Sequence, residues 1–123
     1  MTRVRGVRGA TTAESNTREA IISATKELLE RVVEENAIRI DDLAAAFFTT
    51  TEDLNAEFPA LAARQMGWGY VALLGGQEIS VPDAQAKCIR VLLMLNTDKA
   101  PQELTHVYLR GASSLRDRGI EEV

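Results

Sequence analysis

The run KCIRVLLML over residues 87–95 constrains the fold more than any other part of this chain. It is almost wholly apolar and is followed by the polar segment 96–98, as expected for a β-strand that is buried on both faces. The alternation of a strand places Arg90, Leu92 and Met94 on one of those faces. Because arginine keeps its charge when buried, Arg90 must meet an anion, which is either a carboxylate of the protein or a group on a ligand.

Length and composition indicate one soluble domain. The chain has 123 residues, 46% of them hydrophobic and 26% charged, so we treat residues 1–123 as a single domain with one core. The net charge of -4 and the scattered arginines argue against a nucleic-acid-binding protein. The sequence shows neither the apolar core of a signal peptide nor a run of about 18 apolar residues, so we expect a cytoplasmic protein without a membrane partner.

Side chains for nucleophilic or metal chemistry are scarce. Cys88 is the single cysteine and lies in the apolar run, so we expect a small core residue rather than a nucleophile. His106 is the single histidine and fits a structural or surface position on a strand. The carboxylates form no cluster with the spacing of metal ligands, so we expect neither a metal nor another cofactor.

Hydrophobic periodicity predicts one long amphipathic helix and several strands. Asn16 is the expected N-cap of the helix, with Glu19 closing a capping box, and the apolar residues then recur at steps of three and four. Pro59 and Gly67 are expected to start and end a shorter helix. The predicted elements are a strand over residues 4–9, a helix from 17 to near 36, a strand from about 43, a short helix over 58–67, strands over 70–74, 88–97 and 105–109, and a helical turn at 101–104.

This order predicts an α+β sandwich with a mixed five-stranded sheet, one long helix and one short helix. Two helices cannot cover both faces of five strands, although the strand over residues 88–95 is apolar on both. We therefore expect another subunit to cover the open face. The tail from about residue 115 is expected to be flexible.

Four polar residues have unusual positions on strands or at strand ends, namely Arg8, Glu78, Arg90 and Tyr108. Two arginines, one phenol and one carboxylate suit the recognition of a dianionic ligand better than hydrolysis. Each residue also has a simpler structural interpretation. Arg8 fits an ordinary surface charge, Glu78 fits an ion pair with Lys87, and Tyr108 fits the edge of a sheet.

Short motifs stand in a fixed order along almost the whole chain. They are RGVRGATT at residues 5–12, FPA at 58–60, GW at 67–68, QE at 77–78, KCIRV at 87–91, HVYL at 106–109 and LR at 115–116. Together, from about residue 3 to residue 116, they resemble the monofunctional chorismate mutases of the AroH class. The resemblance implies a homotrimer with the appearance of a pseudo-α/β-barrel, whose active sites lie in clefts between neighbouring subunits.

The resemblance also implies roles for individual residues. Arg8, Glu78, Arg90 and Tyr108 match the polar, catalytic residues of the family. The residues implied to bind substrate are Phe58 and Ala60 from the adjacent subunit, the peripheral Arg64, Leu73 and Leu74 on the pocket wall, Gly75 through its backbone amide, and Leu115 and Arg116 in the segment that covers the ligand.

Two positions depart from the family pattern. Gly75 stands where a cysteine is common, and its backbone N–H survives that change. Leu61 stands where a lysine is common, so a positive charge that attracts a dianion is missing near the mouth of the site.

The implied reaction explains the residue types. Chorismate rearranges to prephenate by an intramolecular Claisen-type shift in aromatic amino-acid biosynthesis, which needs no nucleophile, base or cofactor. The enzyme must hold a flexible dianion in its reactive shape and stabilise the negative charge that grows on the ether oxygen. We expect Arg90 at that oxygen, Arg8 and Tyr108 at carboxylates, and Glu78 at the ring hydroxyl.

Two other functions remain open from the sequence. One is a non-catalytic trimeric binding or sensor domain that holds an aromatic or dicarboxylate metabolite with the same arginines. The other is a small trimeric enzyme similar to the enamine hydrolases, which also build sites between subunits but lack these motifs.

Overall fold

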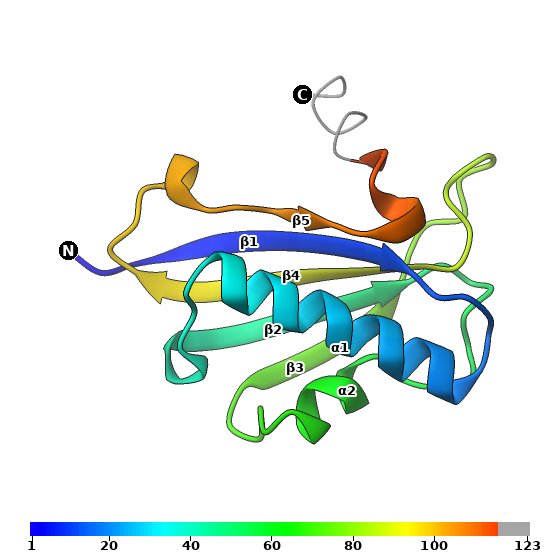
Figure 1. Ribbon diagram of the computed structural model, residues 1–123, viewed down its shortest axis with the longest axis horizontal. Helices are drawn as coiled ribbons and strands as arrows, with labels where there is room; N and C mark the ends of the chain where they lie inside the picture. Colours follow the sequence, from blue (N-terminus) through cyan, green and yellow to red (C-terminus); the bar gives the residue numbers. More distant parts are fainter. Residues whose placement is uncertain (116–123) are drawn as a thin grey trace.

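The computed structural model describes residues 1–115, in which one β-sheet carries two helices on a single face (Figure 1). The strand order is β3-β2-β4-β1-β5. Strand β4 runs antiparallel to β1 and β2, whereas β1 pairs with β5 and β2 pairs with β3 in parallel. The elements are β1 (Arg3–Thr12), α1 (Arg18–Glu35), β2 (Leu43–Thr50), α2 (Ala60–Gln65), β3 (Ala72–Gln77), β4 (Cys88–Thr97) and β5 (Val107–Tyr108), with short 3-10 helices at Ile40–Asp42, Pro101–Glu103 and Arg110–Ala112. The mixed five-stranded sheet and the α+β class are confirmed.

Helix α1 begins one residue later than the capping prediction requires. The hydroxyl of Thr17 accepts the N–H of Ala20 at 3.1 Å, so Thr17 is the N-cap. Glu19 then lies one position too early for a capping box, and that prediction is wrong, although its charge in the first turn still favours the helix dipole. Asn16 instead accepts the backbone N–H of Asn55 at 2.9 Å and ties the start of α1 to a distant loop.

Strands β1, β3 and β5 differ in extent from their predicted ranges. Strand β1 spans Arg3–Thr12 rather than residues 4–9. Strand β3 begins at Ala72 rather than at residue 70, because a turn precedes it. In this turn Trp68 is buried, and its backbone carbonyl accepts the N–H of Val71. It then continues through Gly75 and Gly76, which pair with β2. Glycine has no side chain that could show the alternation of a strand, so the sequence pattern does not predict this part of β3. Strand β5 has only two residues instead of the predicted five.

The core lies between α1 and the face of the sheet that α1 covers. Its largest members include Leu28 and Val32 of α1, Leu93 of β4, and Trp68 after α2, all almost completely buried. Gly9 of β1 allows this close packing, since a Cβ there would lie 3.1 Å from both Leu28 and Val32.

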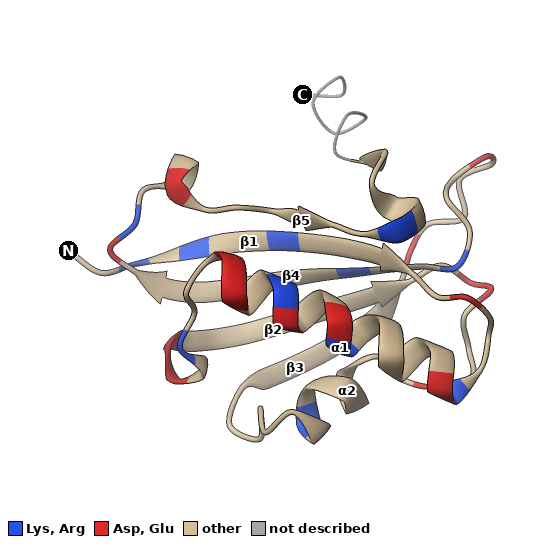
Figure 2. Cartoon of the chain, in the orientation of Figure 1, with Lys and Arg blue, Asp and Glu red and all other residues tan. Residues whose placement is uncertain are grey.

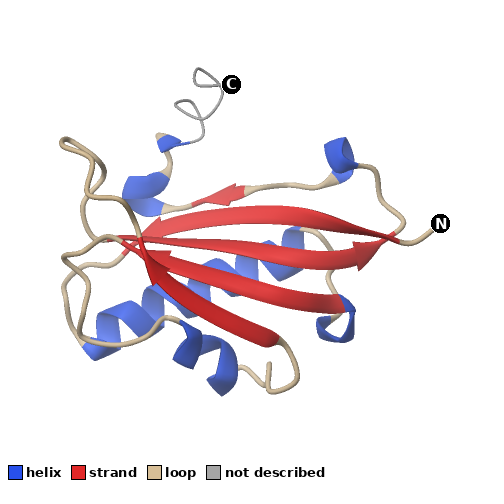
Figure 3. Cartoon of the chain, turned by 180° about the vertical axis from the view of Figure 1, so that it is seen from behind, coloured by secondary structure: helices blue, strands red, loops and turns tan. Residues whose placement is uncertain are grey.

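The other face of the sheet is open, as the reverse view shows (Figure 3). Strand β4 buries Ile89, Val91, Leu93 and Leu95, whereas Arg90 and Leu92 are exposed. The prediction that this strand is buried on both faces is therefore wrong for a single chain, because the open face has no covering layer. That face displays large exposed apolar side chains from four strands, namely Val4, Phe47, Leu74 and Leu92.

Within residues 1–115, no helix is both long and apolar enough to cross a membrane. The same part of the chain contains no group of three or more His, Cys, Asp or Glu residues that could hold a metal ion.

Candidate active site

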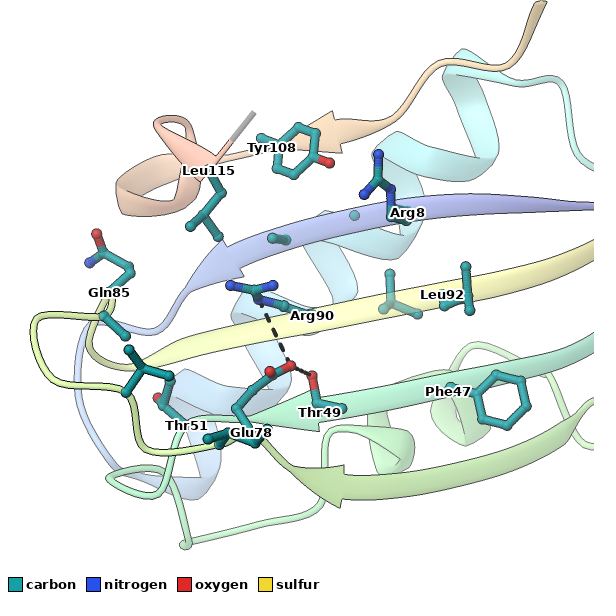
Figure 4. A pocket seen from close by; sticks show the side chains of 16 residues that line it. Arg8, Phe47, Thr49, Thr51, Glu78, Gln85, Arg90, Leu92, Tyr108 and Leu115 are labelled. Carbon is teal, nitrogen blue, oxygen red and sulfur yellow. Dashed lines mark hydrogen bonds and ion pairs between the residues drawn. The ribbon is translucent and has the colours of Figure 1, made fainter. Parts of the chain in front are cut away.

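A pocket of about 690 Å³ lies on the open face, over the ends of β1 and β2 and the beginning of β4 (Figure 4). The predicted residues Arg8, Glu78, Arg90, Tyr108 and Leu115 all line it. They come from β1, the loop after β3, β4, β5 and the segment after β5, so the fold brings together positions that are distant in sequence. The remaining lining residues are Gly9, Ala10, Phe47, Thr49, Thr51, Ile79, Val81, Ala84, Gln85, Val91 and Leu92.

Arg90 and Glu78 lie next to each other on the pocket wall and form an ion pair. Nε of Arg90 lies 3.8 Å from Oε2 of Glu78, which also accepts the hydroxyl of Thr49. The register of β2 and β4 sets this arrangement, because it places Thr49 opposite Arg90. A guanidinium has five N–H donors, so Arg90 can hold Glu78 and still bind a ligand anion. Arg90 thus meets a protein carboxylate, while the alternative pairing of Glu78 with Lys87 is wrong.

The backbone holds Glu78 in place. Its N–H donates to the carbonyl of Thr50 at 2.8 Å, which extends the contact between β3 and β2 by one residue. The carboxylate is half-buried and therefore has a defined position from which to accept a further hydrogen bond.

Arg8 and Tyr108 form the opposite side of the pocket. Arg8 pairs with Leu92. Ala10, the next residue of β1 on the same face, pairs with Arg90 and Tyr108. Arg8 and Arg90 therefore lie on the same face of adjacent strands, two positions apart. Two guanidinium groups against one carboxylate give the pocket a net positive charge. The acidic residues of α1 lie on the other side of the sheet (Figure 2).

His106 lies beside the pocket rather than in it. Its Nδ1 accepts the backbone N–H of Arg8 at 2.9 Å. Burial, reinforced by the positive charge of Arg8, lowers the pKa of His106 below its ordinary value. The imidazole is thus a structural residue at the start of β5, as expected.

Cys88 is 1% exposed and packs with Ala10 and Ala112. Burial raises the pKa of its thiol, although Arg90 acts in the opposite direction. A buried thiol that resists ionisation is a poor nucleophile, in agreement with its predicted place in the core.

Several predicted substrate contacts lie outside this pocket. Phe58, Ala60 and Arg64 belong to α2 or to its start, and Leu74 and Gly75 lie on β3, the other edge strand. Phe58 and Leu74 are strongly exposed, at 76% and 62%. Leu73 packs against the core on the helix-covered face, so it cannot form part of a pocket wall on the open face. Arg116 and the rest of the predicted tail lie outside the described residues.

Sequence reasoning missed Phe47, Thr49, Ile79, Val81 and Gln85 as pocket residues. Phe47 and Thr49 alternate with the buried Phe48, a pattern that assigns them to the open face but not to a site. The other three lie in the loop between β3 and β4, whose sequence has no periodicity from which to predict their direction.

Two arginines, a fixed carboxylate and a phenol around one pocket have the chemistry to bind and orient an anionic ligand. The chain belongs to the chorismate mutase type I family, whose model matches residues 4–118. It is 51% identical to chorismate mutase AroH of Thermus thermophilus, over 92% of this chain and 93% of that protein. It is 43% identical to chorismate mutase AroH of Bacillus subtilis (strain 168), over 92% and 90% of the two chains.

The fold agrees with this relationship. A solved chorismate mutase structure from Clostridium thermocellum superposes with a TM-score of 0.86 and 47% sequence identity, covering 88% of this chain and 96% of that one. The predicted family is confirmed.

Proposed function

We propose that this chain is an isomerase that rearranges chorismate to prephenate, in aromatic amino-acid biosynthesis, in the pocket lined by Arg8, Glu78, Arg90 and Tyr108. The observation that carries the proposal is the convergence of these four side chains in a chain of the chorismate mutase type I family. The alternative of a non-catalytic sensor domain is not favoured, because the relatives from Thermus thermophilus and Bacillus subtilis and the solved structure from Clostridium thermocellum are all named chorismate mutases.

Arg90 is the principal catalytic residue in this proposal. As the ether C–O bond stretches, negative charge develops on its oxygen, and a fixed guanidinium stabilises that charge more than it stabilises the ground state. The contact of Nε with Glu78 restrains the side chain in advance, so little reorganisation is needed when the charge appears. The fork of N–H donors can reach a carboxylate and the ether oxygen together.

The other polar residues orient the substrate. Arg8 and Tyr108, on the opposite side of the pocket, hold substrate carboxylates through charge-assisted hydrogen bonds. Glu78, which is fixed by Thr49 and Arg90, accepts the ring hydroxyl. Holding both ends of a flexible dianion favours the reactive conformer and lowers the entropic part of the barrier. Leu115 closes the pocket from the C-terminal side and helps to exclude water.

We further propose a homotrimer with the appearance of a pseudo-α/β-barrel, in which each pocket is completed by a neighbour. The open face exposes apolar side chains from four strands, and a soluble monomer seldom leaves such a face uncovered. Phe58, Ala60, Arg64, Leu74 and Gly75 lie away from the pocket of their own chain, near its opposite sheet edge. In a closed ring they line the pocket of the adjacent subunit. We further propose a cytoplasmic location for this assembly.

Arg90→Lys tests the catalytic role. Lysine keeps the charge but loses the fork, and losing one such donor costs on the order of 2.7 to 4 kcal/mol, or roughly 10²- to 10³-fold in kcat. We expect a folded protein that still binds prephenate weakly and loses at least about 100-fold in kcat, measured by the disappearance of chorismate absorbance.

Arg39→Lys is the matched control, because it makes the same change at an exposed position outside the pocket. We expect it to leave kcat unchanged. A well-folded Arg90→Lys protein with kcat within about threefold of the parent, less than 1 kcal/mol, contradicts the role of Arg90. Binding of chorismate by the parent without turnover supports the sensor domain instead.

A further inference from the structure

The hydrogen bond from the backbone N–H of Arg8 to the imidazole of His106 lies directly before the parallel pairing of β1 with β5. The paired residues of this ladder are Gly9 with Val107 and Ala10 with Tyr108. The carbonyl of Ala10 accepts the N–H of Leu109 at 2.9 Å, so Ala10 presents its backbone groups to the β5 edge. Alternation along a strand then directs the N–H of Arg8 to the same edge. There it meets Nδ1 of His106 at 2.9 Å.

We propose that His106 is a positioning residue for Arg8, whose backbone it anchors so that the guanidinium is directed into the pocket. This inference rests on the substrate-binding role of Arg8 in the proposed function. Arg8 is exposed on β1 between the buried Val7 and Gly9, and it pairs on its other side with Leu92. The two-residue β5 offers little further backbone pairing, so the imidazole supplies the contact that holds β1 to this edge at Arg8.

The contact requires a neutral imidazole. An Nδ1 atom that accepts a hydrogen bond carries no proton, which assigns the proton of neutral His106 to Nε2. Arg8 faces the imidazole from β1, while Tyr108 and Glu103 flank it along its own segment. The carboxylate of Glu103 already accepts the N–H of Ala100 at 2.9 Å. Helix α1 packs on the opposite face, against Val107. Protonation of Nδ1 places two N–H donors against each other and breaks the contact.

The test uses a matched pair of variants at this position. His106→Asn keeps an acceptor, since Oδ1 of asparagine takes the place of Nδ1, and His106→Leu removes it. Arg8 holds a substrate carboxylate that is present in both the ground state and the transition state. A misplaced Arg8 therefore weakens the binding of both states equally, which raises KM and leaves kcat almost unchanged. We expect His106→Leu to raise KM for chorismate about fivefold with kcat within about twofold, and His106→Asn to restore KM.

A double-mutant cycle with Arg8→Ala separates positioning from general stability. If His106 acts through the guanidinium of Arg8, His106→Leu has no further effect on KM once that side chain is gone. An equal rise in KM in both backgrounds overturns the inference while leaving the proposed function intact. If Arg8→Ala itself leaves KM unchanged, the role of Arg8 fails and the inference fails with it.

A pH profile provides an independent measurement if His106→Leu does not fold. We expect KM of the parent to rise as the pH falls below the ordinary imidazole pKa of about 6.5, while KM of His106→Asn rises less because asparagine does not titrate. Parallel profiles for the parent and His106→Asn, or a KM for His106→Asn that is as poor as that of a folded His106→Leu, overturn the inference.

Discussion

Thr11 and Thr25 are both fully buried, but only one of them has a partner for its hydroxyl. The hydroxyl of Thr25 donates to the carbonyl of Ile21 at 2.7 Å. Oγ1 of Thr11 has no hydrogen-bond partner within the described part of the chain. A buried polar atom without a partner loses its hydration and gains nothing in return.

Thr11→Val is therefore expected to stabilise the protein, because valine keeps the shape of the side chain and removes the unpaired hydroxyl. We expect the free energy of unfolding to rise by about 1 kcal/mol. Thr25→Val, the matched control, is expected to lower it by up to about 1 kcal/mol. Urea unfolding at one protein concentration measures both values. A loss of stability in Thr11→Val shows that its hydroxyl is paired in solution.

The stability of the protein is also expected to depend on pH through His106. Its pKa in the folded protein lies below the ordinary 6.5 because of burial and Arg8, so the unfolded chain binds the proton more readily. The contribution of neutral His106 is thus fully present above about pH 6.5 and is lost as the pH falls toward the folded pKa. We expect the stability of the parent relative to His106→Asn to be constant above pH 7 and to fall in acid. A constant difference from pH 5 to pH 8 contradicts this expectation.

At this scale the sequence predicted the polar half of the site well. Arg90 was evident because a guanidinium in an apolar run needs an anion. Arg8, Glu78 and Tyr108 were noted for their positions on strands or at strand ends, and the motifs then implied a role for each. Thr49 was missed because its contact with Glu78 depends on the register of β2 against β4. Register is a property of two strands together, and neither strand alone shows it.

An ion pair between Arg110 and Glu27 links the segment after β5 to α1. Nε of Arg110, at the start of the 3-10 helix Arg110–Ala112, lies 3.0 Å from Oε1 of Glu27. Its Nη1 lies 3.9 Å from Oε1 of Glu14. Arg110 has a φ of 52°, a conformation that costs energy for a residue with a Cβ. The two carboxylates help to offset that cost, and the chain leaves this helix in position to bring Leu115 to the pocket.

Truncation after Ser114 is expected to raise KM more than it lowers kcat, because the removed segment mainly retains bound substrate rather than acting at the ether oxygen. Initial rates over a range of chorismate concentrations measure both constants. Truncation after Arg116 is the control, and we expect it to keep KM within about twofold of the parent. An unchanged KM after truncation at Ser114 shows that Leu115 does not contribute to binding.

Among the elements, those with strong side-chain patterns were predicted most closely. Helix α1 ends at Glu35 and β4 spans Cys88–Thr97, both near the predicted limits. Strand β3 was displaced because its glycines carry no pattern. Strand β5 was overestimated because the side chain of His106, not the backbone, takes the hydrogen bond of Arg8.

At the scale of the whole molecule, the open face is the feature that a single chain leaves unexplained. The sequence indicated that β4 is apolar on both faces, but it could not show which face a helix covers and which face a second copy would cover. Phe47, Leu74 and Leu92 are exposed in the isolated chain. Their burial is a property of the proposed trimer.

Sedimentation velocity is expected to show a trimer at micromolar concentration. Leu74→Glu places a charge on the open face, so we expect it to give smaller species and to lower activity at the same time. Ser23→Glu adds the same charge on the exposed side of α1 and is expected to change neither. A fully active monomer, for the parent or for Leu74→Glu, contradicts the trimer and the shared pocket.

The central place of β4 in the sheet also has a consequence for the order of folding. Its partners in β1 are 76 to 94 residues away in the sequence, from Thr12 with Cys88 to Arg3 with Thr97. Pairings across such long loops form slowly. On the ribosome, β1 and β2 emerge first, but neither can complete the sheet until β4 has been synthesised. Because Arg90 arrives on that late strand, the chain acquires its fold and the proposed principal catalytic residue in the same step.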